Sequence, residues 1–162
     1  MITSSLAIAR KDLRLAFAGG QGPVQAVLLG LLLVFIFSLS AAPGERFSAQ
    51  QAMAIFWLCS SFGVVLIFSL LFRFEEENDT ATALLLSPLP VQGLWLGKTL
   101  AGLLLLLLCQ VFFFPAALVF LGLDPGGNLP GLVLMVLAVD VGLCVLGGLI
   151  GAMGQGQQPG GP

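Results

Sequence analysis

The stretch that decides the fold class is TLAGLLLLLLCQVFFFPAALVFLGL, residues 99–123, which contains no charged side chain. A helix needs about 20 mostly apolar residues to cross the hydrocarbon core of a bilayer. Lipid offers no hydrogen-bonding partner to backbone amides and carbonyls, so a single segment crosses it as a helix, whose backbone groups bond to one another. The stretch therefore predicts a transmembrane helix.

Three further stretches meet the same criterion: residues 23–42, 52–72 and 131–153. The whole chain is 58% hydrophobic and 9% charged, whereas about 25% of the residues of a soluble domain are charged. So few charges cannot cover a water-soluble globule. We expect an all-α integral membrane protein, in which residues 1–153 form a single transmembrane domain with four transmembrane helices and residues 154–162 form a disordered tail.

The composition also excludes several functional classes. The chain has no His and no Tyr, so it lacks the commonest metal ligand and general base. Cys59, Cys109 and Cys144 stand singly in apolar runs, which is typical of small core residues rather than of a disulfide framework or a zinc site. A net charge of −2 offers no basic patch for nucleic acid. We expect no enzyme active site, no directly bound metal or cofactor, and no nucleic-acid partner.

The basic residues are distributed unevenly between the two sides of the predicted spans. Five of the six precede the first span or lie between the second and third: Arg10, Lys11, Arg14, Arg73 and Lys98. Arg46 lies on the other side. Because Lys and Arg are enriched in cytoplasmic loops, we expect both termini and the loop at residues 73–98 to be cytoplasmic.

Residues 3–17 predict a separate amphipathic helix before the first span. A helix of this kind lies in the headgroup plane of a bilayer, with membrane lipid as its partner. The alternative is that these residues lengthen the first transmembrane helix. The first apolar stretch is longer than the core of a signal peptide, so we do not expect it to be cleaved. The predicted apolar face, opposite the three basic residues, consists of Leu6, Ala9, Leu13, Ala16 and Phe17.

The loop at residues 73–98 carries the densest group of charges in the chain. Its acids favour the N-terminus of a short helix lying parallel to the membrane, and the Ser-Pro pair that follows ends such a helix. The leucines between them would need cover from headgroups or from a groove on a partner. A solvated acidic turn is the alternative, and the residues alone leave both open. The candidate contact residues are Glu75, Glu76, Glu77, Asp79, Leu84, Leu85, Leu86, Ser87, Pro88, Leu89 and Pro90.

The same loop carries a resemblance to a known family. LLLSPLP at residues 84–90, preceded by LFR at residues 71–73 and the acids, resembles the haem exporter protein B family (CcmB), the permease subunit of the ABC transporter for cytochrome c maturation. The basic opening ARKDLR at residues 9–14 is similar to that of the family, and Lys98 also fits its pattern. The resemblance covers about residues 8–151.

The resemblance implies an ABC-2-type permease with six spans, paired with an ATPase subunit in the bacterial inner membrane. The loop after the second span would act as a coupling helix that docks into a groove on the ATPase. The ATPase would bind ATP, since this chain has no phosphate-binding loop of the G-x-x-x-x-G-K-[ST] type. The family works with other membrane proteins of cytochrome c maturation, and ATP hydrolysis releases a haem-loaded chaperone. Haem is therefore an expected handled or transported ligand, although the absence of His gives no support for its ligation here.

The sequence departs from the family pattern in two places. Residues 78–82 read NDTAT where the family usually shows an acid followed by Gly-x-Leu-Glu, so the coupling helix is expected to start differently or to dock less tightly. After residue 151 the family continues through two more spans, whereas this sequence ends in a Gly/Gln/Pro tail, which we interpret as a truncation. Two alternatives therefore stay open: a permease of another ABC-2-type exporter, or an inactive truncated membrane fragment.

Two features inside the predicted spans are candidates for a role. Asp140 lies in the middle of the fourth span, where a charge costs at least about 2.5–3.5 kcal/mol. It could serve gating, a lateral contact or a proton-linked step; the interpretation we prefer is a neutral carboxyl hydrogen-bonded to a neighbouring backbone group or to a polar side chain such as Gln110, Ser60 or Ser61. Gly147 and Gly151 stand four residues apart, a spacing that lets helices approach closely. They would serve either self-association of the permease or, as we prefer, packing within the chain.

Overall fold

The computed structural model describes residues 2–18, 21–41, 47–77, 91–124, 127 and 129–155. These residues form helices and short connections, without a strand among them, which confirms the expected all-α class. Four of the helices are long and apolar enough to cross a membrane. The helices are α1 (Ile2–Ala18), α2 (Gln21–Ser40), α3 (Ala49–Glu77), α5 (Val91–Phe120) and α6 (Leu129–Gln155).

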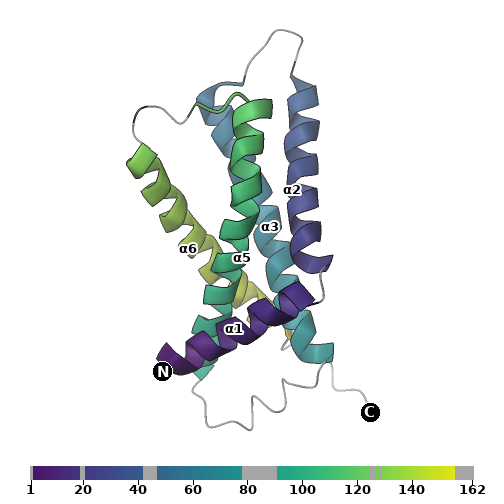
Figure 1. Cartoon of the computed structure of the whole chain (residues 1–162), viewed down its shortest axis with the longest axis vertical. Helices are drawn as coiled ribbons and strands as arrows, with labels where there is room; N and C mark the ends of the chain where they lie inside the picture. Colours follow the sequence, from purple (N-terminus) through teal and green to yellow (C-terminus); the bar gives the residue numbers. More distant parts are fainter. Residues whose placement is uncertain are drawn as a thin grey trace.

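The four long helices form a bundle with the short helix at one end. In Figure 1, α2, α3 and α5 run side by side, α6 diverges from them toward one end, and α1, in purple, lies across the other end. Helix α6 packs against α3 and α5, whereas α1 packs mainly against α5. Since α1 ends at Ala18 and runs across the bundle, the alternative that it lengthens the first transmembrane helix is wrong.

Helix α3 is the central helix, and its start has a clear local cause. The Ser48 hydroxyl accepts a hydrogen bond from the Gln51 backbone amide at 3.2 Å, and the Gln51 side-chain oxygen accepts one from the Ser48 amide at 2.9 Å. This reciprocal pair is a capping box, which satisfies two amides that a helix N-terminus leaves without partners. Within the bundle, 61% of the spanning part of α3 is buried, compared with 17% for α6.

The connection between α3 and α5 is shorter than predicted, because both helices extend beyond their apolar stretches. Helix α3 continues through residues 73–77 and α5 begins at Val91. The prediction that the acids at residues 75–77 begin a separate short helix is wrong, since they form the last turn of α3. Glu is a strong helix former, and no Gly or Pro interrupts the sequence between Val64 and Glu77 to end the helix sooner.

The end of α6 also differs from the expectation. The helix continues through Gln155, so the prediction that a disordered tail begins at residue 154 is wrong for its first two residues. Residues 156–162 lie outside the described part of the chain. The Gln at position 155 is a good helix former, and the helix reaches it although two of the five residues from 151 to 155 are glycines.

The core of the bundle is built from aromatic rings that occupy the space left by glycines on neighbouring helices. The ring of Phe113 on α5 contacts Gly30 of α2, and the ring of Phe68 on α3 lies between Gly102 of α5 and Gly147 of α6. A Cβ atom at position 102 would lie 2.5 Å from the Phe68 ring. Because lipid tails are as apolar as the side chains themselves, close packing of this kind, rather than escape from water, holds membrane helices together.

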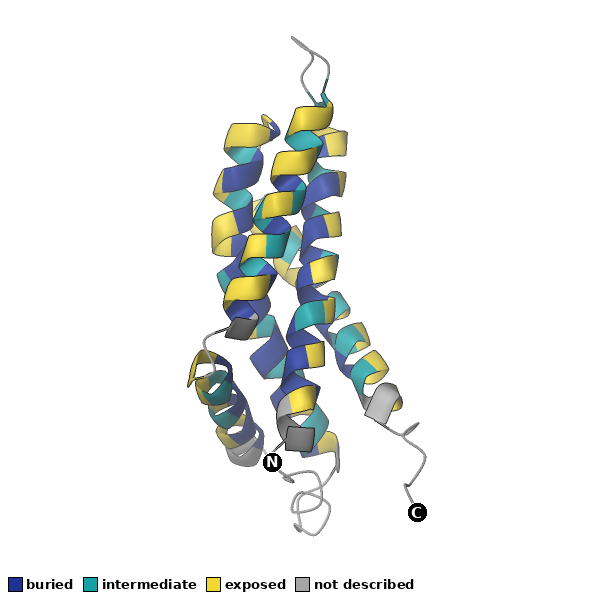
Figure 2. Ribbon diagram, turned by 90° about the vertical axis from the view of Figure 1, so that its right-hand side faces the viewer, coloured by how far each residue is buried: buried dark blue, intermediate teal, exposed yellow. Residues whose placement is uncertain are grey.

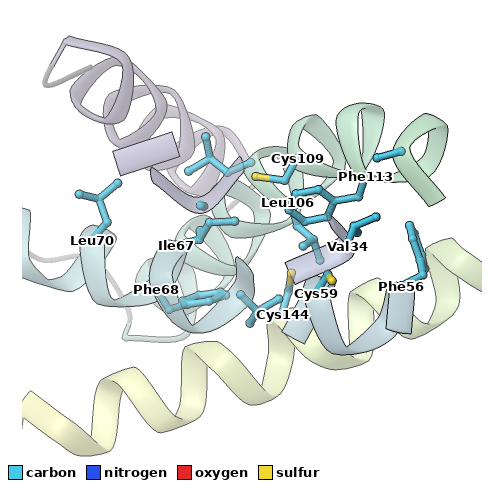
Figure 3. Close-up of a cluster of buried hydrophobic side chains, with 14 of the residues drawn as sticks. Val34, Phe56, Cys59, Ile67, Phe68, Leu70, Leu106, Cys109, Phe113 and Cys144 are labelled. Carbon is cyan, nitrogen blue, oxygen red and sulfur yellow. The ribbon is translucent and has the colours of Figure 1, made fainter. Parts of the chain in front are cut away.

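The three free cysteines lie in the same core, one on each of three helices. Cys59 of α3, Cys109 of α5 and Cys144 of α6 are fully buried. Figure 3 shows this interior, and Figure 2 shows the buried surfaces turned inward and the exposed ones outward along each helix. The cysteines therefore fill core space as small apolar residues.

Candidate functional site

The first candidate region is the pair of helix ends that border residues 78–90. Lys98 on α5 is 3% exposed, and its Nζ atom donates a hydrogen bond to the carbonyl oxygen of Leu71 on α3 at 3.2 Å. The same Nζ atom lies 4.4 Å from the centroid of the Phe72 ring, an arrangement that attracts a cation to the aromatic face. One buried lysine thus ties the end of α3 to the beginning of α5.

Helix α1 packs on the first turns of α5. The contact includes Gly97, the residue before Lys98. The Ser5 hydroxyl donates a hydrogen bond to the carbonyl oxygen of Gly93 at 3.0 Å. Four residues further along α5, a Cβ atom at Gly97 would lie 2.9 Å from the Ile8 Cβ atom and from the Ser5 carbonyl oxygen. The two backbones therefore approach as closely as they do because position 97 is a glycine.

The buried face of α1 agrees with the predicted apolar face only in part: Ala9 and Ala16 are buried, and Leu13 packs against the core. Leu6 and Phe17 were expected on the apolar face but are 60% and 58% exposed, whereas Ser5, Ile8 and Asp12 are buried. The physical reason is that α1 packs on the glycines of α5, and this contact fixes the rotation of the helix. Leu6 and Phe17 are thereby left on the surface of the chain.

Asp12 is a buried acid that the sequence analysis did not single out. It is 2% exposed, and its Oδ1 atom lies 3.2 Å from the Nζ atom of Lys11. Its Oδ2 atom has no hydrogen-bond partner among the described residues. In the sequence Asp12 stands between basic residues and belongs to a polar stretch, so no local pattern marks it as buried.

The second candidate region is a polar cluster inside the membrane that joins three helices. The side-chain amide of Gln110 on α5 donates a hydrogen bond to Asp140 Oδ1 on α6 at 2.7 Å and lies 3.3 Å from the hydroxyl of Ser60 on α3, within hydrogen-bonding range. Asp140 is fully buried, and its Oδ2 atom has no partner in the described part of the chain. The Ser61 hydroxyl instead donates to the Trp57 carbonyl within its own helix.

The structure places both candidate glycines of α6 against α3 of the same chain. A Cβ atom at Gly147 would lie 2.6 Å from the Phe68 ring and 2.8 Å from Val64 Cγ1. Gly151, one turn later, abuts the Phe72 ring. In this chain the glycines therefore let α6 approach α3.

Most of the predicted loop contacts lie outside the described residues. Glu75, Glu76 and Glu77 lie in the last turn of α3, and their side chains are not described. The remaining eight residues lie outside the described part of the chain: Asp79, Leu84, Leu85, Leu86, Ser87, Pro88, Leu89 and Pro90. In the residues that the structure does describe, no group of three or more Cys, Asp or Glu side chains could hold a metal ion.

Comparison with known proteins identifies relatives that are named heme exporter protein B. Heme exporter protein B of Pseudomonas aeruginosa is 29% identical over 157 residues, which are 97% of this chain and 70% of the relative. That of Bradyrhizobium diazoefficiens is 26% identical over 151 residues, 93% of this chain and 67% of the relative. For the Escherichia coli protein the values are 29% over 94 residues, 58% of this chain and 43% of the relative.

The chain thus spans less than half of the Escherichia coli relative and about two thirds of the other two. No solved structure matches it. The sequence model of the CcmB protein family matches residues 3–160, nearly the whole chain. Together with the four apolar helices, this match establishes that the chain is a multi-pass membrane protein that belongs to the CcmB protein family.

Proposed function

We propose that this chain is the permease subunit of an ABC transporter for haem export and cytochrome c maturation. The observation that carries the proposal is the family match over residues 3–160, together with relatives named heme exporter protein B. The four membrane-spanning helices supply a membrane component. Since the sequence has no phosphate-binding loop, ATP is bound and hydrolysed by a separate partner subunit.

The segment between α3 and α5 is the part that docks on the ATPase. Its two flanking helices are joined by the bond from Lys98 to the Leu71 carbonyl. A force applied to this segment therefore acts on α3 and α5 together rather than on one helix. This arrangement supports a coupling role for the acids of residues 75–79 and for LLLSPLP at residues 84–90.

The permease handles haem without ligating it through imidazole, since the chain has no His. ATP hydrolysis by the partner then serves to release a haem-loaded chaperone, in a complex with other membrane proteins of cytochrome c maturation. The complex lies in the bacterial inner membrane. The five basic residues before the first span and between the second and third spans support a cytoplasmic location for both termini and for the docking segment.

Capture of the partner from native membranes tests this function. The full chain carrying an affinity tag should retain an ABC ATPase, and Leu85→Glu with Leu86→Glu should reduce its retention and the yield of c-type cytochromes. Gln50→Glu is the matched control, because it adds a negative charge at an exposed position at the other end of α3. Equal amounts of each variant in the membrane exclude a defect in insertion.

The outcomes separate the alternatives. Retention of an ATPase with cytochrome yields that never depend on this chain would favour a permease of another ABC-2-type exporter. Failure of the unmodified chain to retain any ATPase would overturn the proposal and favour an inactive membrane fragment.

A further inference from the structure

The face of α1 that points away from the bundle carries three basic residues within two helical turns. Arg10 and Arg14 are exposed, and neither has an ion-pair partner among the described residues. Lys11 lies beside them, but it forms an ion pair with Asp12, with 3.2 Å between Lys11 Nζ and Asp12 Oδ1. Residues four apart lie on the same helix face with Cβ atoms about 5–6 Å apart, so the two guanidinium groups can reach a common anion.

A hollow adjoins these charges. It has a volume of about 560 Å³ and is lined by Leu6, Ala7, Arg10, Lys11, Arg14 and Leu15. The hollow is open to the surface rather than enclosed. Its lining combines cationic heads with aliphatic side chains, the combination that a charged headgroup attached to hydrocarbon requires.

The position of α1 places this face at one end of the apolar spans, since α1 ends at Ala18 and the first span begins at Pro23. The helix lies across the end of the bundle in Figure 1 and beside that end in Figure 2, so its outer face points sideways from the spans. This is the level at which the spanning helices leave the hydrocarbon and the phosphate groups of a bilayer begin. Leu6 and Phe17, both mostly exposed, flank the arginines with apolar surface that suits acyl chains.

We propose that this face of α1 is a binding site for an anionic glycerophospholipid. The guanidinium groups of Arg10 and Arg14 donate hydrogen bonds to phosphate oxygens, for which their forked geometry is well matched. Leu6 and Phe17 contact the acyl chains. Because the opposite face of α1 holds the first turns of α5 through Ser5 and Ile8, a bound lipid also holds the start of α5 in place.

Lipid retention measured by native mass spectrometry of the full chain tests the site. The chain is released from micelles that contain equal amounts of phosphatidylglycerol and phosphatidylcholine. The unmodified chain should retain phosphatidylglycerol preferentially. Replacing both arginines, Arg10→Gln with Arg14→Gln, should lower that preference by about tenfold or more, since each basic residue near an anionic surface contributes about fivefold.

Three further variants make the test specific. Arg73→Gln removes one positive charge from an exposed position on α3, so it should leave the preference unchanged if the α1 face is the site, whereas Arg14→Gln alone should lower it. Arg10→Lys with Arg14→Lys keeps the charge but loses the fork, so it should restore only part of the preference. Unchanged elution of each variant as a folded monodisperse species shows that the fold is retained.

Three results would overturn the proposal. The first is an undiminished phosphatidylglycerol preference in the double Gln variant. The second is release of the lipid by millimolar inorganic phosphate, which would show a site for free anions. The third is a double Gln variant that retains lipid normally but no longer retains the ATPase, which would make the basic face a protein-docking surface.

Discussion

At the scale of single residues, Gln110 of α5 contacts two other transmembrane helices, α3 and α6, through one side-chain amide. Its Nε2 atom donates to Asp140 on α6 and lies within hydrogen-bonding range of Ser60 on α3. The amide is uncharged, so it satisfies one oxygen of the Asp140 carboxyl without bringing a second charge into the membrane. A buried carboxyl with one amide partner and apolar surroundings is better accommodated as the neutral acid than as the anion.

Replacing Gln110 should therefore loosen the bundle. Gln110→Met keeps the volume but leaves Asp140 and Ser60 without this partner. The free energy of unfolding should fall by about 0.6 kcal/mol, the average for hydrogen bonds between membrane helices, and by no more than about 1.7 kcal/mol. Denaturation of the chain in mixed micelles with increasing sodium dodecyl sulfate measures the change. Ser61→Ala is the control, since that hydroxyl bonds within its own helix. Equal stability of Gln110→Met and the unmodified chain would contradict the prediction.

A second variant tests the ionisable proton of Asp140 while keeping the hydrogen bond from Gln110. Asp140→Asn keeps an oxygen that can accept from Gln110 but cannot lose a proton. If the cluster serves only packing, this variant should leave the yield of c-type cytochromes unchanged in a complementation assay. A large loss of yield with unchanged stability would instead assign the carboxyl a proton-linked role.

Lys98 is the other buried polar residue whose contacts define its role. Lys98→Met removes the bond to the Leu71 carbonyl and the cation above the Phe72 ring. We expect a loss of about 1–3 kcal/mol in the free energy of unfolding, together with faster proteolysis between α3 and α5. Limited proteolysis in membranes measures the second effect. Lys98→Arg, which keeps a cation, should be less affected, and identical cleavage of all three chains would argue against a tie between the two helices.

At the scale of helices, the contact between α3 and α6 depends on glycines that face aromatic rings. Phe68 contacts Gly147 and Phe72 contacts Gly151, one turn apart on both helices. A side chain at these positions would push α6 away and draw Asp140 from Gln110, since both contacts lie on the same face of α6. The glycine positions and the polar cluster therefore support each other.

A comparison of two glycines on α6 isolates this effect. Gly147→Ala introduces a Cβ atom 2.6 Å from the Phe68 ring, and forcing the helices apart should cost about 1–3 kcal/mol. Gly142→Ala meets nothing within 4 Å, so it should be neutral or stabilise by up to about 1 kcal/mol through helix propensity. Denaturation in mixed micelles measures both. A loss of similar size in both variants would show that packing against α3 is not the cause.

The helices were predictable to different degrees for physical reasons. The four spans followed from the sequence, because the bilayer sets their length and demands apolar side chains. The rotation of α1 did not, because it depends on Gly93 and Gly97 of α5, far away in the chain. The burial of Asp12 could not be predicted either, because it follows from the same rotation of α1. Helix α3 ends later than its apolar stretch predicts. The acidic residues are typical of the start of a new helix, but no Gly or Pro ends α3 before Glu77.

At the scale of the whole molecule, the asymmetry of the basic residues and the position of α1 point to one orientation. The helix with the basic face lies at the end of the bundle where α3 ends and α5 begins. Arg73 and Lys98 lie at that same end, while α3 starts at the opposite end. The proposed lipid site of α1, the bond from Lys98 to Leu71 and the helix ends that border the proposed docking segment thus lie at one end of the bundle. If both proposals hold, a lipid that fixes α1 acts near the surface on which the ATPase docks.

Labelling of single introduced cysteines tests this orientation directly. The three native cysteines are fully buried, so the unmodified chain should not react with a membrane-impermeant maleimide and serves as the control. Gln50→Cys, exposed at the start of α3, should be labelled in spheroplasts, because that end faces the periplasm if Lys and Arg mark the cytoplasm. Gln92→Cys, exposed at the start of α5, should be labelled only after permeabilisation. The reverse pattern would place the docking segment outside the cell, where no ATP is available, and would refute the coupling role together with the orientation.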